Sequence, residues 1–295
     1  MPELPEIETV RLQLGRVLPG RIITEVKILG YGTVKGNEKL ILNRKVEGVR
    51  RKAKVLLVDF EGGITMAFHF KMTGQLILDK DGQGETWKDR IVGGHPTEDF
   101  VGSLPSAHTR VVFKLDQGTM YYNDQRMFGW VKIGTREEIE KDKFLLALGP
   151  EPFDIGEEEF TKLVGRPKRP IKLVLMDQEV ISGVGNIYAN DALWEAGIDP
   201  RSRSDQLTSE QSALLLEKIK LVLSEGIKYG GATAADAKYI DLRGLGGHYQ
   251  EHFRVYDQEG EECHRNDGGI IHKFVLGGRG TYFCPVCQKW DIWDK

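Results

Sequence analysis

The residues of this chain best suited to covalent chemistry lie at its N-terminus, where Glu3 follows Pro2. A methionine before a small residue is usually removed, and loss of Met1 would leave Pro2 with a free secondary amine. A free α-amine has a pKa of about 7.7–8.0, against about 10.4 for lysine, so much more of it is nucleophilic near neutrality. A secondary amine that attacks an aldehyde carbon gives an iminium directly, which is Schiff-base catalysis. Glu3 is placed to donate or accept protons, with Glu6 near it. If Met1 is retained, the amine is blocked.

The same residues also fit an ordinary helix start. Pro5 suits the first turn, because its missing N–H costs nothing there. An apolar stripe at helical spacing then runs up to Pro19-Gly20, through Ile7, Val10, Leu14, Val17 and Leu18. The helix N-terminus would lower the pKa of the Pro2 amine, whereas Glu3 and Glu6 would raise it, and the sequence leaves the balance open. Taken alone, these residues favour a plain N-terminal helix.

A second group suited to chemistry is the turn before Asn186. Gly183 and Gly185 precede this residue and allow a tight turn with exposed N–H groups. A helix that starts at such a turn makes an anion site, to which the Asn186 side chain can add a donor for a phosphate. A helix–turn–helix packing unit, with glycines for close approach, explains the pattern about equally well.

The three cysteines form a third group. Cys284 and Cys287 have the Cys-x2-Cys spacing of half a tetrahedral zinc site, and Cys263 precedes them. Three clustered cysteines are too few for a disulfide framework. For a fourth ligand the nearby residues offer Asp267, His264 or His272, and the sequence does not choose among them. A metal-free hairpin is the alternative.

The N-terminal hexamer Met1-Pro2-Glu3-Leu4-Pro5-Glu6 resembles the start of bacterial formamidopyrimidine-DNA glycosylases, the 8-oxoguanine repair enzymes. Relatives that remove oxidised pyrimidines, of the endonuclease VIII type, usually have Gly in place of Leu4. Residues 183–190 resemble the helix–two-turn–helix of this family, in which the Asn at the place of Asn186 grips the DNA backbone. The resemblance covers nearly the whole chain, with motifs in family order.

The resemblance implies roles for five further residues. Lys54 matches the family lysine that contacts the sugar-phosphate of the lesion. Met72, Arg126 and Phe128 stand at the positions of the void-filling triad, which enters the gap left by an extruded base. Arg126 would satisfy the orphaned partner base, and Phe128 would wedge the stack. Arg279, at the tip of the C-terminal hairpin, matches the DNA-gripping arginine.

The zinc motif departs from the family pattern. Members usually carry a second Cys-x2-Cys where Cys263 stands, but here Asn266 replaces the expected cysteine. An apparent one-residue insertion also precedes Gly268-Gly269. The three retained cysteines still favour one structural zinc ion, with its fourth ligand open.

These residues must be positioned by two kinds of structure. Residues 22–133 are rich in short β-type runs, such as 54–60, 64–70 and 110–115, which predict a β-sandwich or barrel-like domain. Residues 79–107 are polar and contain glycines and prolines, so we expect a long loop.

Beyond residue 150 the pattern becomes helical. Thr208 and Gln211 fit a capping box, and an apolar face should continue until Gly226 and Gly230-Gly231 end the helix. The apolar face consists of Leu215, Ile219, Val222 and Leu223.

The resulting fold is α+β. We expect a catalytic β-sandwich domain with a leading helix over 1–134, a linker over 135–152, a helix–two-turn–helix domain over 153–250 and a zinc-finger-like hairpin over 251–295.

Composition constrains the partners only weakly. The 295 residues are 40% hydrophobic and 29% charged, as in a globular protein, and the net charge of −3 neither favours nor excludes DNA binding. No apolar run approaches the ~20 residues that span a bilayer. The few clustered cysteines favour a reducing cytoplasm, and the family resemblance implies a bacterial monomer that works on the nucleoid, with damaged double-stranded DNA as its partner.

The resemblance implies a bifunctional DNA glycosylase and apurinic/apyrimidinic lyase that acts on oxidised purines, namely 8-oxoguanine and formamidopyrimidines. In this scheme Pro2 attacks C1′, Glu3 supplies a proton, and β- and δ-elimination follow. The alternatives are a pyrimidine-lesion glycosylase of the same fold, a silent DNA- or RNA-binding protein, and a tautomerase. In the family, the region of residues 233–253 holds a loop that closes over the flipped purine, but its residues here do not match one by one.

Overall fold

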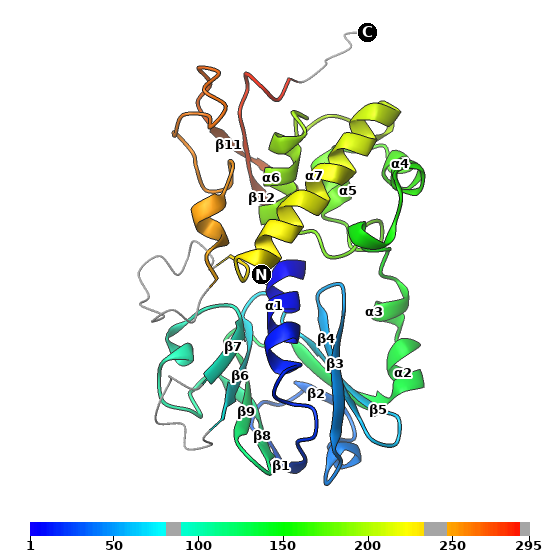
Figure 1. The fold of residues 1–295 in the computed structure, drawn as a ribbon, viewed down its shortest axis with the longest axis vertical. Coiled ribbons are helices and arrows are strands. Elements are labelled where there is room, and N and C mark those ends of the chain that lie inside the picture. Colours follow the sequence, from blue (N-terminus) through cyan, green and yellow to red (C-terminus); the bar gives the residue numbers. More distant parts are fainter. Residues whose placement is uncertain (81–89, 233–246, 290–295) are drawn as a thin grey trace. The chain divides into compact units, whose positions relative to one another are not determined.

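The computed structural model describes residues 1–80, 90–232 and 247–289, drawn as solid ribbon in Figure 1. It divides into two compact units. The first consists of Met1–Leu146 with Tyr229–Gln250, and the second of Ala147–Lys228 with Glu251–Lys295. The described residues on either side of 233–246, namely 229–232 and 247–250, therefore group with the N-terminal unit, whereas the sequence had suggested one domain over 153–250. Most of the purine-covering loop expected at 233–253 lies outside the described residues.

The N-terminal unit is a β-sandwich, and its described residues form two five-stranded sheets (Figure 1). The first sheet has the order β1-β8-β9-β6-β7, with bounds Ile23–Ile28, Thr109–Leu115, Thr119–Asp124, Gly74–Asp79 and Arg90–Gly94. The second has the order β2-β10-β5-β4-β3, with bounds Val34–Gly36, Trp130–Thr135, Ile64–His69, Val55–Phe60 and Val46–Lys52. Neighbouring strands are antiparallel except β2 and β10, which are parallel. The predicted sandwich is confirmed.

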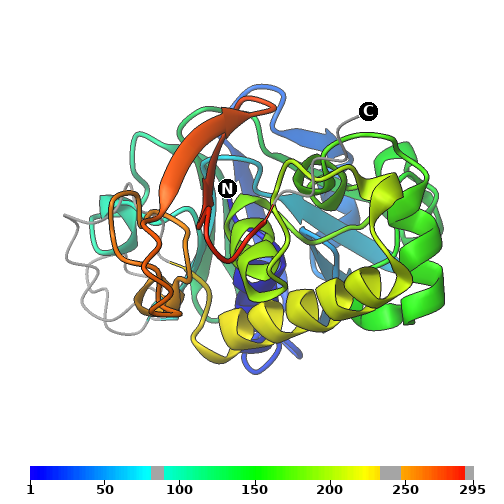
Figure 2. The same ribbon diagram turned by 90° about the horizontal axis from the view of Figure 1, so that it is seen from above.

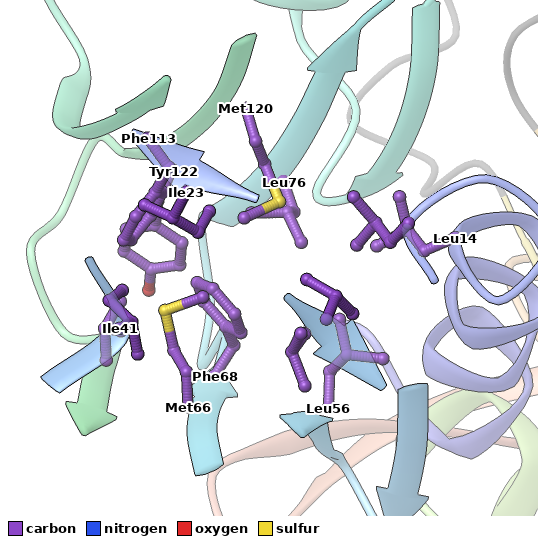
Figure 3. Close-up of a cluster of buried hydrophobic side chains, with 14 of the residues drawn as sticks. Leu14, Ile23, Ile41, Leu56, Met66, Phe68, Leu76, Phe113, Met120 and Tyr122 are labelled. Atoms are coloured by element: carbon purple, nitrogen blue, oxygen red, sulfur yellow. The ribbon is translucent and has the colours of Figure 1, made fainter. Parts of the chain in front are cut away.

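The core of the sandwich lies between the two sheets (Figure 3). Met66 and Phe68 of one sheet meet Phe113 and Tyr122 of the other, and the Phe68 and Phe113 rings pack edge-to-face with centroids 6.0 Å apart. Every residue of β4 and β5 is buried. That burial explains why the runs at 54–60 and 64–70 read as strands even though their apolar residues do not simply alternate.

Helix α1, Leu4–Leu14, packs against β7 and β3, the edge strands of the two sheets, and so covers one open side of the sandwich. The helix ends at Leu14, earlier than its apolar stripe predicted. The chain continues in a turn in which Leu18 N–H donates to Leu14 O at 2.8 Å. Leu18 is nevertheless 1% exposed and belongs to the core. The apolar spacing therefore predicted which residues are buried, but it overestimated the length of the helix.

The expectation of a loop over 79–107 is wrong for part of its length. Strand β7 and the short helix η2, Glu98–Phe100, lie within it. The buried Arg90 side chain donates to Phe100 O at 3.1 Å and Gly102 O at 2.7 Å, which holds this segment against the sheet. A small second core supports it, made of Ile77, Val92, Phe100, Leu104, Val112 and Tyr121.

The expected linker over 135–152 contains two short helices, α2 at Arg136–Glu140 and α3 at Lys143–Leu146, which belong to the N-terminal unit. A 3₁₀ turn, η3, follows at Pro152–Asp154 in the second unit.

The second unit is helical and ends in a two-stranded hairpin, as predicted (Figure 2). Its helices are α4 at Glu157–Gly165, α5 at Ile171–Leu175, α6 at Asn186–Glu195 and α7 at Ser209–Lys228. The hairpin pairs β11, His272–Leu276, with β12, Arg279–Phe283, and β12 packs on α6. Within the described parts of the chain, no helix is long and apolar enough to cross a membrane.

Helix α7 begins at the predicted capping box, where Gln211 N–H donates to Thr208 Oγ1 at 3.1 Å and Thr208 N–H donates to Gln211 Oε1 at 2.9 Å. Gly226 does not end this helix, contrary to expectation. A Cβ at this position would lie 2.5 Å from the Tyr188 ring of α6, so Gly226 serves close packing of two helices. The helix ends at Lys228, before Gly230 and Gly231 with positive φ.

Candidate active site and nucleic-acid interface

The start of α1 positions Pro2 and Glu3. Glu3 has an extended backbone, and its N–H donates to Glu6 Oε2 at 2.7 Å, so Glu6 closes the first turn of the helix. Pro2 is buried, and Glu3 is only 2% exposed. The two residues are therefore held in a defined place away from bulk solvent.

Glu6 also binds a segment that is remote in sequence. Its Oε1 accepts Ala232 N–H at 2.8 Å. Gly231 has φ +84°, and a Cβ there would lie 2.8 Å from Glu6 Oε1, so only glycine fits this approach comfortably. The carboxylate therefore joins the start of α1 to the segment after α7. The sequence offered Glu6 only as a neighbour of Glu3.

Lys54 lies at a turn between β3 and β4. Ala53 adopts a left-handed conformation with φ 50°, and Arg51 Nη1 donates to its carbonyl at 2.9 Å. Lys54 is 4% exposed. Burial lowers the pKa of its ammonium to about 8, against the opposing effect of the Glu3 and Glu6 charges. The structure thus brings Lys54 into electrostatic range of both carboxylates of the N-terminal site.

His69 is a residue of this region that the sequence reading missed. It is 6% exposed and packs against Trp130 and Phe144, with ring centroids 5.5 and 5.2 Å away. Burial lowers its pKa to about 3, with further lowering by the Lys71 and Lys54 cations. The imidazole is therefore neutral, and since Nδ1 accepts Lys71 N–H at 2.9 Å, its proton is on Nε2. A histidine at the end of a buried strand is too common a pattern to have indicated this.

The predicted void-filling residues lie on two turns that are hydrogen-bonded to each other. Met72 is half-buried on the turn between β5 and β6. The next residue, Thr73, donates from Oγ1 to Asp124 Oδ1 at 2.5 Å and accepts Arg126 N–H at 3.0 Å. The structure therefore brings Met72 and the loop after β9 together.

The loop after β9 presents Arg126 and Phe128 to solvent. The Arg126 guanidinium lies 4.7 Å from the centroid of the Phe128 ring, and Phe128 is 55% exposed. Gly129 N–H donates to Asp124 Oδ2 at 2.7 Å, and a Cβ on Gly129 would lie 2.0 Å from Tyr122 Oη. The loop thus has a fixed base and an exposed aromatic tip.

The predicted phosphate turn precedes α6. Gln178 closes it: its Nε2 donates to Val184 O at 2.8 Å and its Oε1 accepts Gly183 N–H at 3.0 Å. Asn186 is the first residue of α6, as predicted. Its Oδ1 is covered and has no hydrogen-bond partner among the described residues. In the same unit, Arg279 is exposed at the first position of β12.

The cysteines form a compact cluster with one carboxylate. Ligand atoms of Cys263, Asp267, Cys284 and Cys287 all lie within 4.8 Å of one another. Cys263 Sγ and Cys287 Sγ are 3.9 Å apart, and Cys284 Sγ is 3.5 Å from Asp267 Oδ2. In a tetrahedral site with Zn–S of about 2.3 Å and Zn–O of about 2.0 Å, these edges would be about 3.8 and 3.5 Å. The four side chains fit one zinc ion.

Of the fourth-ligand candidates, only Asp267 lies in this cluster. Asn266 has a left-handed backbone, φ 53°, and its N–H donates to Cys263 O, which carries the chain to Asp267. The Asp267 Oδ1 accepts Gly269 N–H at 2.8 Å, which lowers the pKa of the carboxyl. His264 instead packs against Trp194, and His272 is exposed on β11.

Comparison with protein families covers most of the chain. Residues 1–131 match the formamidopyrimidine-DNA glycosylase N-terminal domain, 148–238 match the H2TH domain of the same enzymes, and 268–289 match the zinc finger found in FPG and IleRS. The formamidopyrimidine-DNA glycosylase of Pelotomaculum thermopropionicum is 37% identical over 297 residues, which are 98% of this chain and 99% of that protein. The chain belongs to the formamidopyrimidine-DNA glycosylase family.

Other members of the formamidopyrimidine-DNA glycosylase family agree in sequence and fold. The enzyme of Ruegeria pomeroyi is 33% identical over 299 residues, covering 98% of this chain and all of that protein. A solved complex of Lactococcus lactis Fpg with DNA containing an abasic site superposes with a TM-score of 0.82 at 29% identity, covering 98% of this chain and 100% of that one. The Fpg protein of Thermus thermophilus gives a TM-score of 0.81 at 33% identity, covering 97% and 98% of the two chains.

In this chain the match to the zinc-finger family begins only at residue 268. Cys263 and Asp267 lie outside it, yet the structure places both with Cys284 and Cys287. The family model thus recognises the half of the site that keeps the usual pair of cysteines. Cys263, which the sequence already indicated, and Asp267, one of its candidates for the fourth ligand, make up the other half.

Proposed function

We propose that this protein excises oxidised purines, 8-oxoguanine and formamidopyrimidines, from damaged double-stranded DNA and then cleaves the strand as an apurinic/apyrimidinic lyase. The observation that carries the proposal is the buried Pro2-Glu3 pair at the start of α1, beside the Lys54 ammonium. Membership of the formamidopyrimidine-DNA glycosylase family supports the same chemistry. Leu4, which follows the pair in sequence and is fully buried, supports the purine specificity, since the pyrimidine-lesion relatives usually have glycine here.

The reaction begins at the Pro2 nitrogen after removal of Met1. The amine lone pair attacks C1′ of the flipped nucleotide, the C1′–N bond to the base breaks, and the departing base or the opening sugar takes a proton from Glu3. The amine loses its proton, the C1′–O4′ bond of the sugar ring breaks, and the nitrogen lone pair forms the C=N bond of an iminium that joins Pro2 to C1′. Loss of a C2′ proton then expels the 3′ phosphate, and a second elimination expels the 5′ phosphate.

Lys54 serves this reaction as a buried cation. With a pKa of about 8 it is mostly protonated at neutral pH, and it faces the carboxylates of Glu3 and Glu6. We assign its ammonium to the sugar-phosphate of the lesion. A buried cation attracts a phosphate strongly, because little water screens it.

Five residues bind the DNA around the lesion. Met72, Arg126 and Phe128 fill the gap left by the extruded base, and their two linked turns support this role. Asn186 and Arg279 bind phosphates of the backbone. A structural zinc ion is held by Cys263, Asp267, Cys284 and Cys287 and stabilises the segment that carries Arg279. The protein acts as a monomer on nucleoid DNA in the bacterial cytoplasm. Analytical ultracentrifugation with and without DNA would measure its oligomeric state and so test this assignment.

The deciding experiment is a borohydride trap on a duplex with a single 8-oxoguanine opposite cytosine. Reduction converts the iminium to a stable amine, and mass mapping should place the crosslink on Pro2. Pro5→Ala is the matched control, because it changes a proline of the same helix turn that has no free amine, and it should crosslink normally. Undiminished strand cleavage by Pro2→Gly would overturn the mechanism. A crosslink only with an oxidised pyrimidine would overturn the purine specificity.

A further inference from the structure

Asn190 joins the helix that begins at Asn186 to the hairpin strand that begins at Arg279. Its Nδ2 donates to Asn186 O at 2.6 Å, and its Oδ1 accepts Tyr282 N–H at 2.9 Å. The residue is 1% exposed. Because one end of the amide donates and the other accepts, the orientation of this side chain is fixed by its partners.

The paths from Asn190 to Asn186, which is half-buried, and to Arg279, which is exposed, are short and rigid. Asn186 lies one helical turn before it, at the start of α6. Arg279 lies three positions before Tyr282 on β12, a strand whose last three residues are buried. Over such distances a helix turn and a paired strand leave little freedom of the backbone.

A second buried side chain fixes the same strand. Lys172 of α5 is fully buried, and its Nζ donates to Gly280 O at 2.9 Å and to Thr281 Oγ1 at 2.7 Å. Residues 280–282 are therefore hydrogen-bonded to both helices: Gly280 and Thr281 accept from Lys172 of α5, and Tyr282 N–H donates to Asn190 of α6. The partner strand β11 has no buried residue, so the place of Arg279 depends on these bonds to β12.

We propose that Asn190 is a positioning residue, which fixes the spacing of Asn186 and Arg279 so that they bind the DNA backbone as one preformed unit. The inference rests on the proposed function, in which both residues contact phosphates. A preformed pair loses less conformational freedom on binding than two independent contacts do. Asn186 and Arg279 are then energetically coupled through Asn190, although only their own side chains contact the phosphates.

A double-mutant cycle in two backgrounds tests the coupling. The dissociation constant for a duplex with a non-cleavable abasic-site analogue is measured for Asn186→Ala, Arg279→Ala and the double variant, first with Asn190 intact and then with Asn190→Leu. With Asn190 intact, we expect the combined loss of affinity to differ from the product of the single losses by about threefold or more. With Asn190→Leu, the losses should multiply. Hydrogen exchange at the Tyr282 amide should also rise in Asn190→Leu.

Gln288→Leu is the matched control, since Gln288 is another buried amide that bridges two segments of this unit. Its Nε2 donates to Ile198 O and its Oε1 accepts Cys284 N–H, both at 2.9 Å. We expect this variant to lose stability and to keep the coupling. If Asn190→Leu does not fold, Asn190→Asp serves in its place, because it keeps the acceptor for Tyr282 and loses the donor to Asn186.

The outcomes separate the inference from the function on which it rests. If Asn186 and Arg279 remain coupled in Asn190→Leu, or if their coupling is lost equally in Gln288→Leu, Asn190 is not the positioning residue. Either result would leave the proposed DNA interface intact. If neither Asn186→Ala nor Arg279→Ala weakens binding in the natural protein, the proposed interface itself is wrong.

Discussion

Thr73 and Asp124 join the two turns that carry the predicted void-filling residues. The Thr73 hydroxyl donates to one oxygen of Asp124 at 2.5 Å, while the other oxygen accepts Gly129 N–H at 2.7 Å. A single carboxylate thus fixes the base of the loop that holds Arg126 and Phe128 against the turn that holds Met72. Side chains that must enter a base stack together gain from such a link, because their relative positions are set before DNA arrives.

Removal of this link should impair action on duplex DNA more than stability. Thr73→Val keeps the shape of the side chain and removes the hydroxyl, and we expect excision from an 8-oxoguanine duplex to fall about tenfold through a loss of 1–2 kcal/mol of positioning. Thr65→Val is the matched control, since Thr65 is also buried and donates to a carboxylate, Asp59, at 2.7 Å. Single-turnover rates of the two variants decide the matter, and equal losses in both would show that the link has no special role.

The sequence predicted elements whose signals are local. The β4 and β5 runs were recognised because strands buried along their whole length are rich in apolar residues. The start of α7 was recognised because a capping box joins residues three apart. The turn before Asn186 was visible for the same reason, since its glycines are neighbours in the chain.

The features that the sequence left open depend on remote partners. Glu6 receives Ala232 N–H from a segment far along the chain, and Gly226 is required by the Tyr188 ring. Strand β7 is held by side-chain bonds of Arg90 to the segment that follows it. Asp267 could be chosen as a zinc ligand only when the left-handed turn at Asn266 was known. No periodicity or spacing reports such contacts.

We expect the Lys54 side chain to lower the free energy of unfolding at neutral pH while it supports strand cleavage. Burial lowers its pKa from 10.5 to about 8, and at about 1.36 kcal/mol per pKa unit the charged form is disfavoured by roughly 3 kcal/mol. Between these pH values the unfolded chain binds the additional proton, so the free energy of unfolding rises with pH from about 8 to 10.5. We therefore expect Lys54→Met to raise the melting temperature at pH 7, to lose that advantage near pH 10, and to lose most strand cleavage. Calorimetry at both pH values and a cleavage assay measure this.

Lys52→Met supplies the comparison for Lys54, because Lys52 lies two residues away but is exposed. It should change neither quantity appreciably. If the Lys54→Met variant is clearly less stable than the natural protein at pH 7, Lys54 is not a buried cation whose charged form is disfavoured by burial.

The position of the fourth zinc ligand can be tested with two cysteine substitutions. Asp267→Cys should complete a four-thiolate site and retain metal more strongly against a chelator, whereas Asn266→Cys should not, because Asn266 only carries the turn. Cobalt substitution gives a direct readout, since the thiolate charge-transfer absorption should correspond to three sulfurs in the natural protein and four in Asp267→Cys. A gain in Asn266→Cys alone would place the fourth ligand one residue earlier.

Asp191 and Asp199 should respond to amide substitution in opposite ways. Asp191 is fully buried and accepts Val255 and Tyr256 N–H groups at 3.1 Å, and burial raises its pKa to about 6. The folded state thus binds the additional proton between pH 4 and 6, so stability falls as pH rises through this range. Asp191→Asn avoids the buried charge and should be more stable than the natural protein at pH 7 but not at pH 4.

Asp199 is equally buried but ion-paired with Arg201 at 2.5 Å, and Asp199→Asn should therefore destabilise the protein at pH 7. Urea unfolding at the two pH values would refute this account if both variants moved in the same direction.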